Sequence, residues 1–84
     1  MRHASAQTLA RIETLLEQLR GLPGLKEKSR GVFYRGGAAW LHFHEDQAGI
    51  FADLRTSPEW ERLPATTPAQ CSLLVRRIKR ILKC

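Results

Sequence analysis

Hydrophobic residues near the start of the chain recur every three or four positions, which is the repeat of one helical face. We expect a helix over about 5–20, ended by Gly21. The glycine-, proline- and charge-rich segment 21–31 is typical of a loop. The apolar face of this helix consists of Leu9, Ile12, Leu15, Leu16 and Leu19.

The middle of the chain alternates between apolar and polar residues, which predicts strands. Gly36 and Gly37 mark a two-residue hairpin turn, and "EDQAG" marks a second turn. If Arg35 pairs with Ala38 and Phe43 with Ile50, each residue is assigned to one of two faces. The core face then holds Val32, Tyr34, Ala39, Leu41, Phe43, Ile50, Ala52 and Leu54. The outer face holds Phe33, Arg35, Trp40, His42, His44, Phe51, Asp53 and Arg55.

A second helix is predicted over about 68–83. Thr67 is suited to the N-cap, Pro68 to the first helical position and Gln70 to the capping box. Before it, Pro58 and Pro64 allow at most a short edge strand near 62–65. The apolar side of this helix consists of Cys71, Leu74, Val75, Ile78, Ile81 and Leu82.

These elements predict an α+β fold with one domain over 1–84. An antiparallel meander of three to four strands, within about 31–66, would form one layer of a two-layer sandwich, and both helices would cover its core face. Cys71 and Cys84 lie on one predicted helix, about 20 Å apart, so they cannot form a disulfide within it. We expect Cys84 to expose its thiol. No apolar run approaches the roughly 20 residues of a membrane span, so a cytoplasmic location and no membrane partner are expected.

The order of elements around "LPGLKEKSRGVFYRGGAAWLHFHED" resembles small YjbR-like and YdhG-like domains. The likeness covers about residues 10–82 and depends on element order and on residues within 23–34 and 40–43. It implies an antiparallel sheet and a DNA-binding role. Those domains are generally larger, with more strands, and the resemblance implies no catalytic residue.

The basic charge of the chain is concentrated near its C-terminus. The formal net charge is +6, and five of the fourteen cations lie in the last nine residues. Together with outer-face aromatic rings that could stack on bases, these cations suggest nucleic-acid binding. The alternative is a solvated helix face that complements the helix dipole. The cations are Arg76, Arg77, Lys79, Arg80 and Lys83.

Two alternate histidines on one strand suggest a metal site. His42 and His44 would lie about 6.5–7 Å apart at the backbone, with Asp53 on the neighbouring strand as a third ligand. The alternative is a structural role for both rings. No serine or cysteine nucleophile is expected on this face and no glycine-rich phosphate loop occurs, so an enzyme is not favoured and no cofactor is expected.

An exposed aromatic patch on the outer face favours a protein contact. Pairing two copies through this patch would enlarge a core that is small for 84 residues. Alternatively, the segment around Trp60 folds over the patch within one chain. We therefore interpret the chain as a binding or interaction module, homo-oligomeric through the sheet face, with nucleic-acid binding and metal binding as alternatives. The predicted interface consists of Phe33, Arg35, Trp40, His42, Phe51 and Arg55.

Overall fold

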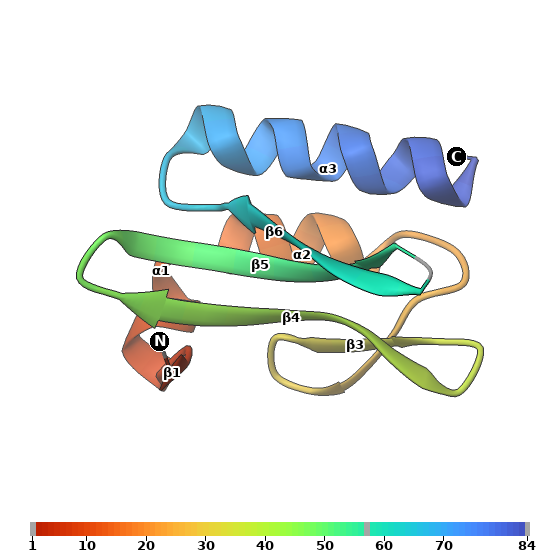
Figure 1. Ribbon diagram of the computed structural model, residues 1–84, viewed down its shortest axis with the longest axis horizontal. Helices are drawn as coiled ribbons and strands as arrows, with labels where there is room; N and C mark the ends of the chain where they lie inside the picture. Colours follow the sequence, from red (N-terminus) through yellow and green to blue (C-terminus); the bar gives the residue numbers. More distant parts are fainter. Residues whose placement is uncertain (1, 57, 84) are drawn as a thin grey trace.

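The computed structural model describes residues 2–56 and 58–83. Cys84, and with it the prediction of an exposed thiol, lies outside these residues. The chain forms six strands and three helices in this range (Figure 1). In chain order they are β1 (Arg2–His3), α1 (Ala6–Arg11), α2 (Glu13–Arg20), β2 (Lys26–Ser29), β3 (Val32–Arg35), β4 (Ala38–Asp46), β5 (Gly49–Thr56), β6 (Glu59–Pro64) and α3 (Pro68–Leu82).

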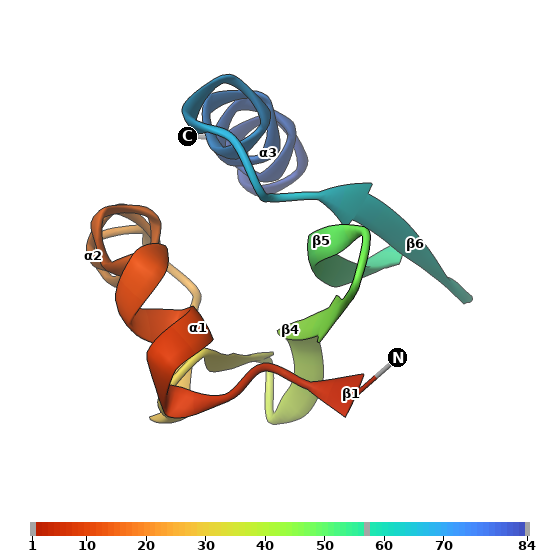
Figure 2. The ribbon, with the colours of Figure 1, turned by 90° about the vertical axis from the view of Figure 1, so that its left-hand side faces the viewer.

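The strands form one antiparallel sheet in the order β2-β3-β4-β5-β6, and β1 also pairs with β4. The strands β3 and β1 use successive stretches of β4, since β3 pairs with 38–41 and β1 with 44–45. The sheet curves around α1, α2 and α3, which lie on one of its sides (Figure 2). The predicted two-layer α+β architecture is therefore confirmed.

The ends of several elements differ from the sequence prediction. The first helix is interrupted at Ile12, and the expected loop over 21–31 contains the strand β2. The last strand begins at Glu59, so it is longer than the short edge strand expected near 62–65. The strand β1 has only two residues and was not predicted. By contrast, Thr67 and Gln70 form the predicted capping box of α3, and Gly21 caps α2.

A bulge in β4 changes the predicted sheet faces. Arg35 pairs with Ala38 as expected, but Phe33 pairs with Leu41, so Trp40 is an extra residue in β4. Phe33 consequently lies on the core side and is fully buried, whereas regular alternation had assigned it to the outer face. Trp40 also packs into the core cluster, with 5% of its surface exposed.

The β4–β5 hairpin is tighter than predicted, but its faces are unchanged. Phe43 pairs with Ala52 rather than with Ile50, and Asp46 pairs with Gly49. This two-residue shift of register preserves the alternation of faces. The N-terminal helices and α3 both contribute buried leucine or isoleucine side chains to the core, as their apolar periodicity predicted. The buried apolar residues of β4 and β5 are Trp40, Leu41, Phe43, Ile50, Ala52 and Leu54.

The helices within residues 2–56 and 58–83 are short and amphipathic. None of them combines the length and the apolar character that crossing a bilayer requires.

Candidate metal centre

Three histidine side chains meet on the outer face of the sheet. His42 and His44 lie two residues apart on β4, and the pairing of β1 with β4 places His3 opposite His44. One ring nitrogen of each residue lies within 4.8 Å of the corresponding nitrogens of the other two. The ring centroids of His3 and His44 are 4.7 Å apart, and those of His42 and His44 are 4.8 Å apart. Because the sequence contains only three histidines, all of them belong to this cluster.

Two nitrogens of the cluster are buried without a hydrogen-bond partner among the described residues. They are Nδ1 of His42 and Nε2 of His44. An unsatisfied buried polar group costs about 1–3 kcal/mol. Burial also lowers the pKa of both imidazoles, and the neighbouring His44 lowers that of His42 further. Both rings therefore favour the neutral form, which has the lone pair that a metal ion requires.

Asp53 contacts the histidine cluster from the neighbouring strand β5, where it pairs with His42 in register. Its Oδ2 lies 3.2 Å from Nδ1 of His44, and it accepts hydrogen bonds of 2.8 and 3.0 Å from Arg62. These bonds from Arg62 hold the pKa of Asp53 below its ordinary value. The carboxylate therefore contacts His44 without belonging to the group of possible ligands. The sequence prediction had made Asp53 a third ligand beside His42 and His44. The third possible ligand beside His42 and His44 is His3.

A carboxylate behind a histidine can fix the tautomer of that ring. When Asp53 accepts the proton on Nδ1 of His44, Nε2 is left with its lone pair. This arrangement is the usual outer shell of a histidine that binds a metal. Asp53 is thus in the geometry of a positioning residue for His44.

Trp60 forms one wall of the cluster. Its ring centroid lies 4.8 Å from that of His42, and the guanidinium of Arg55 lies 4.9 Å from the centroid of the Trp60 ring. Trp60 is 39% exposed, so it covers part of the outer face without closing it. This contact agrees with the alternative in which the segment around Trp60 folds over the sheet within one chain.

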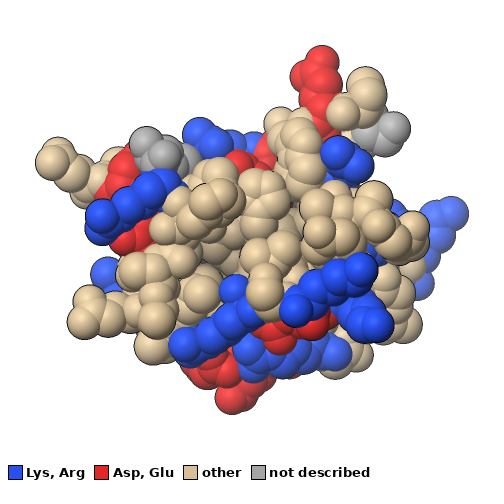
Figure 3. All heavy atoms as spheres, turned by 90° about the horizontal axis from the view of Figure 1, so that it is seen from below, with Lys and Arg blue, Asp and Glu red and all other residues tan. Residues whose placement is uncertain are grey.

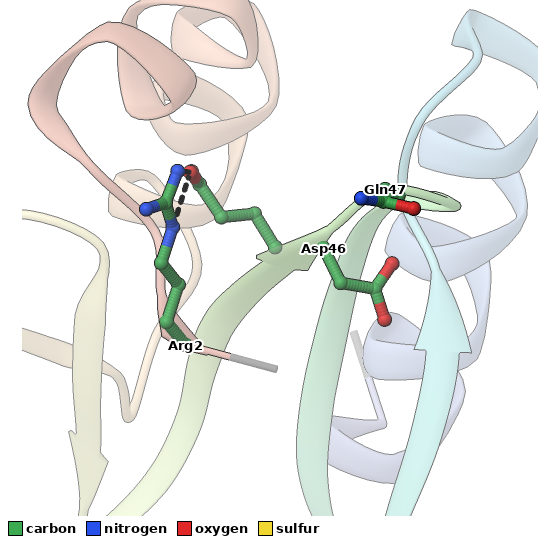
Figure 4. A pocket seen from close by; sticks show the side chains of 4 residues that line it. Arg2, Asp46 and Gln47 are labelled. Atoms are coloured by element: carbon green, nitrogen blue, oxygen red, sulfur yellow. Dashed lines mark hydrogen bonds and ion pairs between the residues drawn. The ribbon is translucent and has the colours of Figure 1, made fainter.

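The short strand β1 is fastened beside the cluster by Glu45. Arg2 donates to Glu45 through Nε and Nη2, at 3.1 and 2.9 Å (Figure 4). The backbone N–H of Ser5 donates to the other carboxylate oxygen of Glu45 at 3.0 Å. Hydrogen bonding from Thr8, the Ser5 N–H and Arg2 lowers the pKa of Glu45 to about 2. Glu45 thereby fixes the backbone that carries His3.

The sequence analysis missed His3 because a two-residue strand has no measurable periodicity. One signal was available. Glu45 lies on the same face of β4 as the core residues Leu41 and Phe43. A carboxylate on this buried face needs a hydrogen-bond partner from another segment.

The predicted interface residues do not form one exposed patch. Phe33 and Trp40 belong to the core, and Phe51 is only partly exposed. Arg35 and Arg55 line a hollow beside Trp40, and no histidine of the cluster lines it. The aromatic surface that motivated the interface is thus reduced, while self-association itself stays a prediction.

The basic residues of α3 are mostly solvated. Arg76, Lys79, Arg80 and Lys83 are exposed, and Arg77 forms an ion pair of 3.1 Å with Glu61 of β6. Seen from the side of the molecule on which β3 lies in Figure 1, basic and acidic side chains are interspersed rather than segregated (Figure 3). That face lies opposite α3, so Figure 3 does not show the basic side of this helix.

Comparisons with family models, curated proteins and solved structures found no match to this chain. The resemblance to YjbR-like and YdhG-like domains therefore stays a prediction.

Proposed function

We propose that the protein binds one divalent transition-metal ion through His3, His42 and His44. The main support is the pair of buried imidazole nitrogens that have no hydrogen-bond partner in the described part of the chain. Both belong to the cluster that unites every histidine of the sequence. A metal ion would accept the lone pairs of these nitrogens and remove the cost of leaving them unsatisfied.

The donor set favours zinc, copper, nickel or cobalt over magnesium or calcium, because imidazole is a borderline ligand and the hard cations prefer oxygen. Zinc binds imidazole at about 2.0–2.1 Å, which separates the nitrogens of a tetrahedral site by roughly 3.4 Å. From a largest separation of 4.8 Å, the rings would have to approach one another by about 1.4 Å. Three protein ligands would leave a fourth position for water or another ligand.

Calorimetric titration of metal-free protein, without any polyhistidine tag, tests this proposal. We expect one Zn²⁺ or Cu²⁺ per chain, no binding of Mg²⁺ or Ca²⁺, and loss of binding in a His42→Ala, His44→Ala double variant. The matched control is Asp46→Asn, which removes an exposed carboxylate close to the cluster. Zn²⁺ binding that survives the double variant, or that Asp46→Asn abolishes equally, would contradict the histidine site.

Nuclear magnetic resonance can identify the coordinating atoms directly. Only three imidazoles contribute to the spectrum, so the ring nitrogens can be assigned with three single variants. We expect Zn²⁺ to shift Nε2 of His44 while its Nδ1 stays protonated toward Asp53. A spectrum in which His3 does not respond to Zn²⁺ would reduce the site to the two histidines of β4.

Self-association through the sheet face is the weaker candidate. Its aromatic basis is diminished, because Phe33 and Trp40 are used in the core. Measurement of the mass in solution, with and without Zn²⁺, distinguishes a monomeric metal-binding domain from an oligomer.

A further inference from the structure

We propose a second ligand site, independent of the histidine cluster, that binds a phosphate group in the hollow beside Trp40. The hollow has a volume of about 630 Å³, which lies within the range of pockets for small organic ligands. Three arginines from three different elements converge on it: Arg35 from β3, Arg55 from β5 and Arg77 from α3. The other lining residues are Gly36, Trp40, Thr56 and Ile81.

Indole rings orient two of the three guanidinium groups. The guanidinium of Arg35 lies 5.5 Å from the ring centroid of Trp40, and that of Arg55 lies 4.9 Å from that of Trp60. Contact with an aromatic ring occupies the face of a guanidinium and leaves its N–H edge available. Such an edge matches two oxygens of a phosphate group.

Within residues 2–56 and 58–83, the hollow carries more positive than negative charge. Arg35 and Arg55 form no ion pair within residues 2–56 and 58–83, and Arg77 is paired with the single carboxylate of Glu61. Three positive groups against one negative group leave a net charge of +2. A phosphate group, with a charge near −2 as a monoester, compensates this excess better than a single carboxylate does.

Two sources can supply this charge: a small phosphorylated molecule, whose monoester carries about −2, or two neighbouring phosphodiesters of a single-stranded nucleic acid, each of which carries −1. Arg77 and Ile81 of α3 line the hollow, so a longer anionic strand that followed this helix toward its C-terminal end would also meet the exposed Arg80 and Lys83. Inorganic pyrophosphate and a short oligothymidylate, titrated separately, distinguish the two sources.

The titration uses wild-type protein and the variants Arg35→Gln and Arg55→Gln. The matched control is Arg76→Gln, which removes the same charge from α3 outside the hollow. We expect pyrophosphate binding, followed by the Trp40 indole resonance, to weaken at least tenfold in each hollow variant and less than threefold in the control.

Oligothymidylate binding that weakens with rising salt and is lost in the same two variants would assign the site to nucleic acid. Binding of pyrophosphate without binding of the oligonucleotide would assign it to a small ligand. The proposal is overturned if neither probe binds, or if Arg76→Gln weakens binding as much as Arg35→Gln does. Because Arg35 has no ion pair in the described part of the chain, its variant should keep the thermal stability of the wild type.

Discussion

Replacement of Asp53 by asparagine should weaken metal binding more than its effect on stability explains. The Asp53 carboxylate lies 3.2 Å from Nδ1 of His44, a position that favours the tautomer with its proton on Nδ1 and a free lone pair on Nε2. An asparagine amide can present either its oxygen or its NH₂ group, so it stabilises both tautomers of His44. Loss of such an outer-shell partner typically lowers metal affinity by about 10–100-fold. We expect a change of this size for Zn²⁺ in Asp53→Asn.

The same substitution should also destabilise the fold. Asp53 accepts two hydrogen bonds from Arg62, at 2.8 and 3.0 Å. Bonds to a charged group contribute about 1.5–3 kcal/mol when buried. The side chain of Arg62 is 50% exposed, so water replaces part of this contribution. We expect a loss of about 1–2 kcal/mol, which lowers Tm by roughly 5–15 °C in a domain of this size.

Arg62→Gln separates the two effects. It removes the same pair of hydrogen bonds but leaves Asp53 against His44 and takes a positive charge away from the site. Stability should fall in both variants, whereas Zn²⁺ affinity measured by calorimetry should fall only in Asp53→Asn. Equal losses of affinity in both variants would show that Asp53 acts through stability alone, and an unchanged affinity in Asp53→Asn would refute the positioning role.

Three further changes test other parts of the structure. Hydrogen bonding lowers the pKa of Glu45 in the folded protein to about 2, below its ordinary value of 4.5. Its stabilising contribution is therefore complete above pH 4.5 and is lost as pH falls toward 2, so Tm should decrease across this window more steeply in the wild type than in Glu45→Gln. Gly49→Ala should strongly destabilise the β4–β5 hairpin, because φ is +139° and the added Cβ would lie 2.3 Å from Oγ1 of Thr66; an unchanged urea midpoint would contradict this geometry. Thr67→Ala should cost about 1 kcal/mol by removing the N-cap of α3, whereas Thr67→Ser should be nearly neutral in the same urea titration.

Local patterns predicted the elements whose determinants are local. The capping box at Thr67 and Gln70 specifies the start of α3, and the positive φ angles of Gly36 and Gly37 fit the predicted hairpin turn. Each of these features is decided by residues within four positions of one another. The start of α3 and the turn between β3 and β4 could therefore be predicted from the sequence.

The faces of β3 and the composition of the histidine site depend on contacts between segments that are far apart in the sequence. Strict alternation assigned Phe33 to the outer face, but the bulge at Trp40 lets both aromatic rings enter the core. No periodicity reveals such a bulge, because its benefit comes from packing against the helices. His3 likewise joins the site only through the pairing of β1 with β4, which depends on Glu45 and has no local signal.

Because β1 pairs with β4, a metal ion bound by histidines of both strands would cross-link two distant parts of the chain. Arg2 and Glu45, which flank the site, are 43 positions apart in the chain. An ion held jointly by His3 and the histidines of β4 would close a loop of about 40 residues in any partly unfolded state that kept it bound. In the chain-entropy description used for disulfides, closing such a loop removes about 4 kcal/mol of conformational freedom from the unfolded chain. Cys71 is a free cysteine, and no disulfide occurs within residues 2–56 and 58–83. The metal ion would therefore give this domain a reversible cross-link.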